Sequence, residues 1–296
     1  LEQSRDYITA LLRQLMTQIA PDGQECLDGT RFLDWPSNSN KDAIAAGLQA
    51  LMVWGMRVGV EFAELFEDRQ LSNDCKAAEK KLVKAASKVY KKFLASCPAP
   101  DAPGSKQVTA LMTITGLIDA PKADKEFLSI NGAQGFSTFY GYYMLEAMAM
   151  AGNYQGALDV IREYWGAMID LGATSFWEDF DINWIPNAAP IDELVPEGKK
   201  DIHGDCGAYC YVGFRHSLCH GWASGPTSWL SRHILGVEVI EPGCRQVRIT
   251  PHLGDLQWVK GTFPTPYGEL QIYHEKQANG NVISEVKAPK GVSVIK

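Results

Sequence analysis

Apolar residues recur at helical spacing through most of the first 170 residues. The spacing predicts a first helix that ends before Pro21, a second that begins after Asn40 and runs towards Phe66, and a third that opens at Asn73 or Asp74. In each, the apolar positions lie three or four residues apart, which marks one buried helix face. The third helix also carries a lysine-rich stretch over residues 80–92, which predicts a solvated outer face.

The middle of the chain predicts a helical hairpin and then a long loop. After a proline-rich break at 97–104, a short helix is expected over 108–118, and residues 136–151 and 154–171 form two helices joined by a tight turn at Gly152. Residues 179–214 are irregular and polar. A loop this long inside a compact domain is often functional. Helices are expected again over 215–222 and 226–235.

The hydrophobic period changes after Gly236. Short alternating runs at 246–250, 256–260, 269–274 and 281–286 predict the strands of a β module, with a domain boundary near residue 237. About eight helices in sequential pairs predict a mainly α fold over residues 1–236. We expect an incomplete (α/α)₆-type toroid of helical hairpins, followed at 237–296 by a small antiparallel β-sandwich. No internal repeat supports a solenoid.

Composition excludes some partners. The formal net charge is −7 and no long basic block is present, which argues against nucleic acid or an anionic membrane as partner. No apolar run approaches the roughly 20 residues of a membrane helix. The seven cysteines are scattered and predict reduced, mostly buried thiols. The cellular compartment stays open.

The segment 172–181 is the first candidate for chemistry. Three carboxylates lie close together and are flanked by aromatic residues, namely Glu178, Asp179 and Asp181 among Phe176, Trp177 and Phe180. Glycoside hydrolysis needs a pair of carboxyl groups, and aromatic rings can stack on sugars. An acidic helix terminus with incidental aromatic neighbours is the structural alternative.

Two further clusters need weighing. Cysteines and histidines gather between residues 203 and 220, but their spacing fits zinc poorly, so we expect no metal and no cofactor. The loop at 32–37 holds Asp34 and Trp35, and an exposed Asp–Trp pair suits sugar binding. A capping and packing turn explains that loop equally well.

Three segments stand out as motifs, namely Gly172-Ala-Thr-Ser-Phe-Trp-Glu178, Ser217-Leu-Cys-His-Gly-Trp-Ala-Ser-Gly-Pro226 and Pro242-Gly-Cys-Arg-Gln-Val-Arg-Ile-Thr-Pro251. The first two together resemble the catalytic domain of bacterial α-L-rhamnosidases, and the third extends the match into the β module. The resemblance implies an (α/α)₆ toroid, a trailing β-sandwich and an inverting mechanism on a rhamnose-containing glycoside. It also implies that Glu178 is the general base and His220 a contact to a sugar hydroxyl, with Asp34 and Trp35 lining the same pocket. Trp177 and Trp222 are expected to form the aromatic wall beside Glu178.

One element of the family pattern is missing. The family's general acid lies in a segment of the form Asp-Gly-x-x-Arg-x-Glu upstream of the base, and nothing in this chain matches it. An (α/α)₆ toroid also needs twelve helices rather than about eight. We therefore expect the C-terminal portion of a larger enzyme, inactive without its N-terminal part. The alternatives are a non-catalytic carbohydrate-binding or scaffold fragment, and a six-hairpin hydrolase for another sugar, such as a uronic acid.

Overall fold

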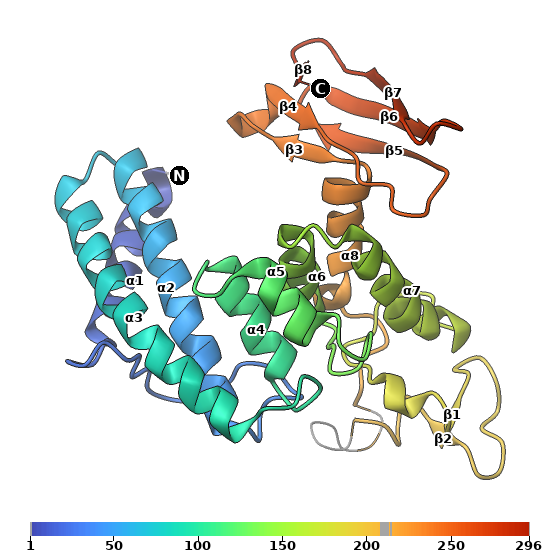
Figure 1. Cartoon of the computed structure of the whole chain (residues 1–296), viewed down its shortest axis with the longest axis horizontal. Coiled ribbons are helices and arrows are strands. Elements are labelled where there is room, and N and C mark those ends of the chain that lie inside the picture. Colours follow the sequence, from blue (N-terminus) through green and yellow to red (C-terminus); the bar gives the residue numbers. More distant parts are fainter. Residues whose placement is uncertain (1, 208–212, 214, 296) are drawn as a thin grey trace. The chain divides into compact units, whose positions relative to one another are not determined.

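The computed structural model describes residues 2–207, 213 and 215–295, and it divides into two compact units (Figure 1). The first holds the described residues up to Ala151 and the second those from Gly152 onward. The division falls inside the region that the sequence treats as one helical domain. The chain is mainly helical, with two three-stranded sheets after residue 236, which confirms the predicted class at this level.

The named elements of the first unit are all helices over its described residues, apart from an isolated β-bridge between Ile19 and Glu25. Its elements are η1 (Glu2–Ser4), α1 (Arg5–Thr17), α2 (Lys41–Leu65), α3 (Arg69–Ser96), α4 (Ser105–Ile114), α5 (Ala120–Ala123), the π-helical turn η2 (Asp124–Leu128) and α6 (Gly141–Met150). The long helices α2 and α3 lie side by side (Figure 1). Their apolar faces share a core with Leu12 of α1, in which Met56 and Leu82 are buried.

Side-chain caps fix where the two long helices begin. The Asn40 side chain accepts the Ala43 N–H at 3.0 Å, as the predicted start of α2 requires. The Asp68 side chain accepts the Leu71 N–H at 2.9 Å, so α3 begins at Arg69. The predicted start at Asn73 or Asp74 is wrong because a stronger cap lies one turn earlier.

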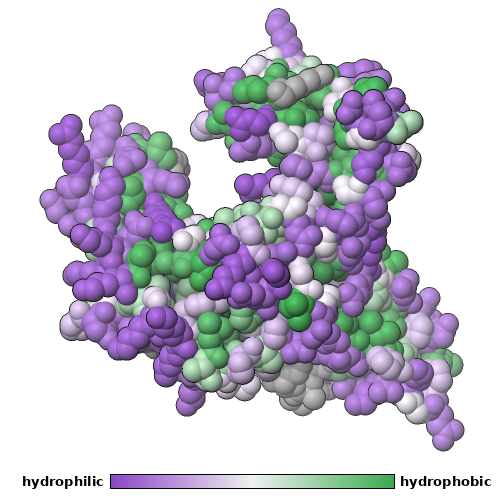
Figure 2. Space-filling view, viewed as in Figure 1, coloured by the Kyte–Doolittle hydropathy of each residue, from purple (hydrophilic) through white to green (hydrophobic). Residues whose placement is uncertain are grey.

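The lysine-rich stretch of α3 lies on an outer face. Its lysines are exposed, namely Lys80, Lys81, Lys84, Lys88, Lys91 and Lys92. The residues Leu82, Val89 and Phe93 of the same helix are buried. Figure 2 accordingly shows a largely hydrophilic surface where α3 lies.

Helix α2 is long and apolar enough to cross a membrane by length and composition, although the sequence was expected to hold no such run. Within the first unit, however, 56% of its most apolar window is buried. Burial of this kind is typical of the central helix of a globular domain.

The second unit begins with helix α7 (Tyr154–Asp170) and continues through short elements. These are η3 (Ile182–Trp184), β1 (Ala188–Ala189), β2 (Lys200–Asp201), η4 (Gly221–Ala223), α8 (Gly225–Trp229) and the π-helical turn η5 (Leu230–Ile234). The helix predicted over 215–222 is wrong: the described residues there form turns and bends up to η4.

The β module holds two three-stranded sheets. Its elements are β3 (Val237–Val239), η6 (Pro242–Cys244), β4 (Gln246–Ile249), β5 (Trp258–Thr265), β6 (Gly268–Lys276), β7 (Val282–Lys287) and β8 (Ser293–Ile295). The strand orders are β3-β4-β8 and β5-β6-β7. Residues from both sheets form one apolar core, with Val247 and Leu270 fully buried. All pairs within the sheets are antiparallel except β4–β8, which is parallel and corrects the expectation of a purely antiparallel module.

Several contacts join the β module to α7 within this unit. The Arg162 guanidinium forms a two-pronged ion pair with Asp255, at 2.8 and 3.0 Å. The Tyr154 ring stacks on His252 with ring centres 3.7 Å apart. These contacts hold the connection between β4 and β5 against the helix that leads to Glu178.

Candidate active site around Glu178

The C-terminus of α7 directs the chain towards Glu178. Gly172 takes a left-handed conformation with φ of 89° and donates its N–H to the Ile169 carbonyl at 2.9 Å. The Ala173 N–H bonds to the Met168 carbonyl at 2.9 Å, which completes a glycine-based helix cap. The Gly-Ala pair of the recognised motif therefore ends the helix and turns the backbone out of it.

A pair of backbone hydrogen bonds brings the two recognised segments together. The Glu178 N–H donates to the Ser217 carbonyl at 2.8 Å, and the His220 N–H donates to the Phe176 carbonyl at 2.7 Å. The Ser217 carbonyl and the His220 N–H take part in this pairing and are not available for hydrogen bonds within a helix. The segment after Ser217 is therefore not helical. The pairing places Glu178 beside His220.

The Glu178 carboxylate is oriented by the same segment. Its Oε2 accepts the Ser217 N–H at 3.2 Å, and its Oε1 lies 3.9 Å from His220 Nε2. The Glu178 side chain is 17% exposed and that of His220 is 35% exposed. The site therefore offers a mostly buried carboxylate next to an accessible imidazole.

Trp222 forms one side of this arrangement. Its indole N–H donates to the Glu178 carbonyl at 2.6 Å, and its ring stacks on His220 with centres 4.4 Å apart. The indole thus holds both the backbone of Glu178 and the ring of His220. The predicted residues Glu178, His220 and Trp222 lie in one cluster.

Trp177 occupies a different environment. Its side chain is fully buried, with its ring edge-on to Phe180 and His216. In this structure Trp177 is part of the core beneath the site, and its role as a sugar contact stays a prediction.

His216 is a structural neighbour that the sequence did not single out as part of this site. Its Nε2 accepts the Asp179 N–H at 3.1 Å, so Nδ1 carries the proton and donates to the Ile202 carbonyl at 3.1 Å. Both His216 and Asp179 are 1% exposed. His216 therefore fixes the backbone immediately after Glu178. The position of His216 close to His220 in the sequence did not indicate this role.

Asp34 and Trp35 belong to the first unit. Asp34 is 3% exposed, and its carboxylate accepts hydrogen bonds from Gln107 Nε2, Ser137 Oγ and the Trp35 N–H. Burial, and then the negative charge of Asp34, raise the pKa of Tyr140. The expectation of an exposed Asp–Trp pair is therefore wrong for Asp34, whose donors hold it inside the unit. Its contact with sugar stays a prediction.

The described part of the cysteine and histidine cluster does not converge on one point. Among the residues that the structure describes, no group of three or more His, Cys, Asp or Glu side chains could hold a metal ion. Cys210, a member of that cluster, lies outside the described residues. Burial raises the pKa of the Cys206 thiol.

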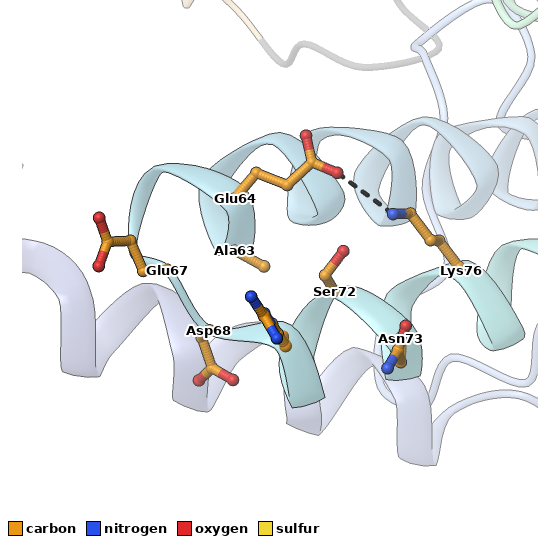
Figure 3. Close-up of a pocket in the computed structure, with 8 residues that line it drawn as sticks. Ala63, Glu64, Glu67, Asp68, Ser72, Asn73 and Lys76 are labelled. Carbon is orange, nitrogen blue, oxygen red and sulfur yellow. Dashed lines mark hydrogen bonds and ion pairs between the residues drawn. The ribbon is translucent and has the colours of Figure 1, made fainter.

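A separate cleft of about 530 Å³ lies at the turn between α2 and α3 (Figure 3). It is lined by charged side chains of both signs, including Glu64 and Lys76, which pair at 3.2 Å. No predicted site residue lines it.

The fold is that of solved α-L-rhamnosidases. A GH78 family rhamnosidase of Bacillus sp. GL1 matches with a TM-score of 0.68 and 20% identity, over 99% of this chain and 30% of that chain. An α-L-rhamnosidase from Dictyoglumus thermophilum matches with a TM-score of 0.71 and 17% identity, over 99% and 32%. The Streptomyces avermitilis α-L-rhamnosidase, solved with L-rhamnose, matches with a TM-score of 0.65 and 18% identity, over 99% and 27%. The chain thus spans about 30% of the first of these structures.

Residues 236–295 match the family described as the bacterial α-L-rhamnosidase C-terminal domain. The resemblance to bacterial α-L-rhamnosidases predicted from the sequence is therefore confirmed. No curated protein sequence matches the chain.

Proposed function

We propose that the chain is the C-terminal portion of an inverting glycoside hydrolase that removes terminal α-L-rhamnose, with Glu178 as its general base. The observation that carries the proposal is the joining of Glu178, His220 and Trp222 by the pairing of residues 176–178 with 217–220. These residues come from the two motifs that resemble the family, and they lie in one cluster. The proposal includes a complete toroid and a β-sandwich in the whole enzyme.

The geometry suits a base that activates water. The Ser217 N–H fixes Oε2, and a charge-assisted hydrogen bond of this kind orients a carboxylate firmly. The 3.9 Å between Oε1 and His220 Nε2 is long for a direct hydrogen bond and leaves a separation that an O–H group can bridge.

In the proposed step, Glu178 removes a proton from a water that attacks the anomeric carbon, while a carboxylic acid on the opposite face protonates the departing glycosidic oxygen. This acid belongs to the N-terminal part of the enzyme, since no segment of the present sequence matches its motif. The His220 ring, stacked on Trp222, contacts a sugar hydroxyl. By the same resemblance, Asp34, Trp35 and Trp177 are assigned as sugar contacts.

The test is Glu178→Gln in the full-length enzyme, assayed on an aryl α-L-rhamnoside. Loss of the base is expected to lower kcat by about 10²–10⁴-fold. L-rhamnose binding by calorimetry is expected to persist, because a base acts on the transition state rather than on binding.

Asp181→Asn is the matched control, because Asp181 is a nearby carboxylate that accepts the Asn183 N–H at 2.9 Å. It is expected to leave kcat within a few-fold. Near-normal turnover by Glu178→Gln would assign the base to another residue. Rhamnose binding by an enzyme without any hydrolysis would instead favour the non-catalytic carbohydrate-binding protein.

A further inference from the structure

The outer face of the β5-β6-β7 sheet carries side chains that the Glu178 site does not use. Strand register sets them in rows: Lys260 pairs with Tyr273 and Tyr273 with Glu285, while Thr262 pairs with Gln271 and Gln271 with Lys287. The strands lie side by side in Figure 1. Six residues of this outer surface make up what we call the β5–β7 face, namely Trp258, Lys260, Gln271, Tyr273, Glu285 and Lys287.

Alternation along the strands separates this face from the core. Val259, Phe263 and Val286 pack inward against the module's apolar core, so their strand neighbours point outward. Trp258 is 60% exposed, an unusual state for the largest side chain. All six residues of the face line a shallow depression of about 850 Å³.

Two aromatic residues occupy diagonal positions on this face. Trp258 pairs with Glu275, and Tyr273 is two residues before Glu275 on the same side of β6, which makes Trp258 and Tyr273 diagonal neighbours. Such neighbours lie about 7–8 Å apart, within reach of aromatic side chains. The face therefore offers an extended aromatic surface rather than one isolated ring.

Hydrogen-bonding groups surround the two rings. Gln271 supplies both a donor and an acceptor, the lysines supply donors, and Glu285 supplies acceptors. Burial, followed by the hydrogen bond to Glu275, raises the pKa of Tyr273. Sugars require this combination, because pyranose rings present an apolar C–H face and a rim of hydroxyls.

The charges on the face exclude other classes of ligand. Lys260 and Lys287 are balanced by Glu285 and the adjoining Glu275. A nucleic acid or anionic lipid surface requires an excess of positive charge, which this face lacks. A balanced face with exposed aromatic rings favours an uncharged, hydroxyl-rich ligand.

We propose that the β5–β7 face is a second carbohydrate site, which binds a segment of a neutral glycan chain without cleaving it. The rings of Trp258 and Tyr273 stack on successive sugar units, and Gln271, Lys260 and Glu285 bind their hydroxyls. The site holds the enzyme on a polymeric substrate and is independent of the proposed role of Glu178.

Native affinity electrophoresis of the 296-residue chain tests the site, in gels with and without soluble galactomannan, xyloglucan or hydroxyethyl cellulose. At least one of these neutral polymers is expected to retard the chain. Trp258→Ala is expected to weaken that retardation by about tenfold, as removal of an aromatic anchor does. Tyr7→Ala is the control, since Tyr7 is an aromatic residue of α1 that is 72% exposed.

Each outcome decides the proposal. Retardation that is lost in Trp258→Ala and kept in Tyr7→Ala supports it. Absence of retardation by all three neutral polymers, or equal retardation of both variants, overturns it. A dimer of the wild-type chain in sedimentation that Trp258→Ala dissociates would also overturn it, because the face would then be an interface between copies. Activity of Glu178→Gln has no bearing on these readouts.

Discussion

At the scale of single residues, the second unit uses histidine in three distinct ways. His216 is buried and neutral between a carbonyl and an N–H, and it holds backbone in place. His220 is partly exposed and stacks on Trp222 beside the Glu178 carboxylate. His252 stacks on Tyr154 at the junction of α7 with the β module. Burial and hydrogen-bond partners, rather than residue type, separate the structural histidines from the one that belongs to the candidate site.

His252 should make stability depend on pH. Burial, and then the nearby His233, lower its pKa from the ordinary value of 6.5. The unfolded chain therefore binds more protons than the folded one between the folded pKa and 6.5, so stability falls as pH drops through that window. The measurement is urea unfolding of the wild type and of His252→Asn from pH 8 to pH 5.

The His252→Asn variant is expected to lose less stability on acidification than the wild type, although it starts less stable because the Tyr154 stack is altered. Parallel pH profiles for the two proteins would contradict this role of His252. His203→Asn, at a partly exposed histidine whose backbone N–H bonds to Asp201, is the control and should follow the wild-type profile.

At the scale of elements, periodicity predicted those helices whose apolar faces are long and regular. Helices α1, α2 and α7 lie where the sequence places them, and so do four strands of the β module. The predicted helix at 215–222 failed because His216 and His220 have helical spacing, whereas the backbone there bonds to residues 176–178. Such non-local pairing leaves no periodic signal in either segment.

The candidate site was only partly predictable for the same reason. A cluster of carboxylates and aromatics drew attention to Glu178, but composition could not separate a catalytic group from an acidic helix end. The link to His220 came from family resemblance, and the supporting role of His216 came only from the structure. The loop position of Asp34 predicts an exposed side chain, because loops usually lie on the surface. Hydrogen bonds from Gln107 and Ser137 instead hold Asp34 inside the first unit.

Gly236 joins η5 to the β module and should tolerate no side chain. Its φ is 77°, and a Cβ there would lie 2.5 Å from the Thr250 carbonyl carbon. Gly152 has the same φ of 77°, but a Cβ there would meet nothing within 4 Å. A substitution at Gly152 therefore measures the cost of the left-handed backbone conformation alone.

Gly152→Ala is expected to cost about 1–2 kcal/mol of unfolding free energy. Gly236→Ala should cost about 1–3 kcal/mol more, because its clash is with rigid backbone. Chemical denaturation of both variants measures the difference. Equal losses of unfolding free energy in the two variants would mean that the backbone at the start of the β module shifts at little cost to accommodate the Cβ.

At the scale of the whole molecule, the β module and the Glu178 segment share one unit through α7. The Arg162–Asp255 ion pair and the Tyr154–His252 stack connect that helix to the module. Helix α7 therefore connects both to the segment that carries the Glu178 carboxylate and to the sheets of the β module. Asp34 and Trp35 belong to the other unit.

The proposed division of catalytic groups predicts that the purified 296-residue chain does not hydrolyse aryl α-L-rhamnosides. Its sequence contains no match to the general-acid motif, and a base alone cannot protonate the departing oxygen. Release of p-nitrophenol from p-nitrophenyl α-L-rhamnoside measures this. Turnover at a rate typical of enzymes, about 1–10³ s⁻¹, would contradict the division.

The paired hydrogen bonds between Glu178 and Ser217 have an evolutionary consequence. They join the two ends of the loop that residues 179–216 form, so the position of the carboxylate is independent of the length of that loop. Because the entropic cost of closing a loop grows only slowly with its length, insertions near Leu194, which is 96% exposed, cost little. Natural variation can therefore change the length of this loop near Leu194 and leave the carboxylate in place.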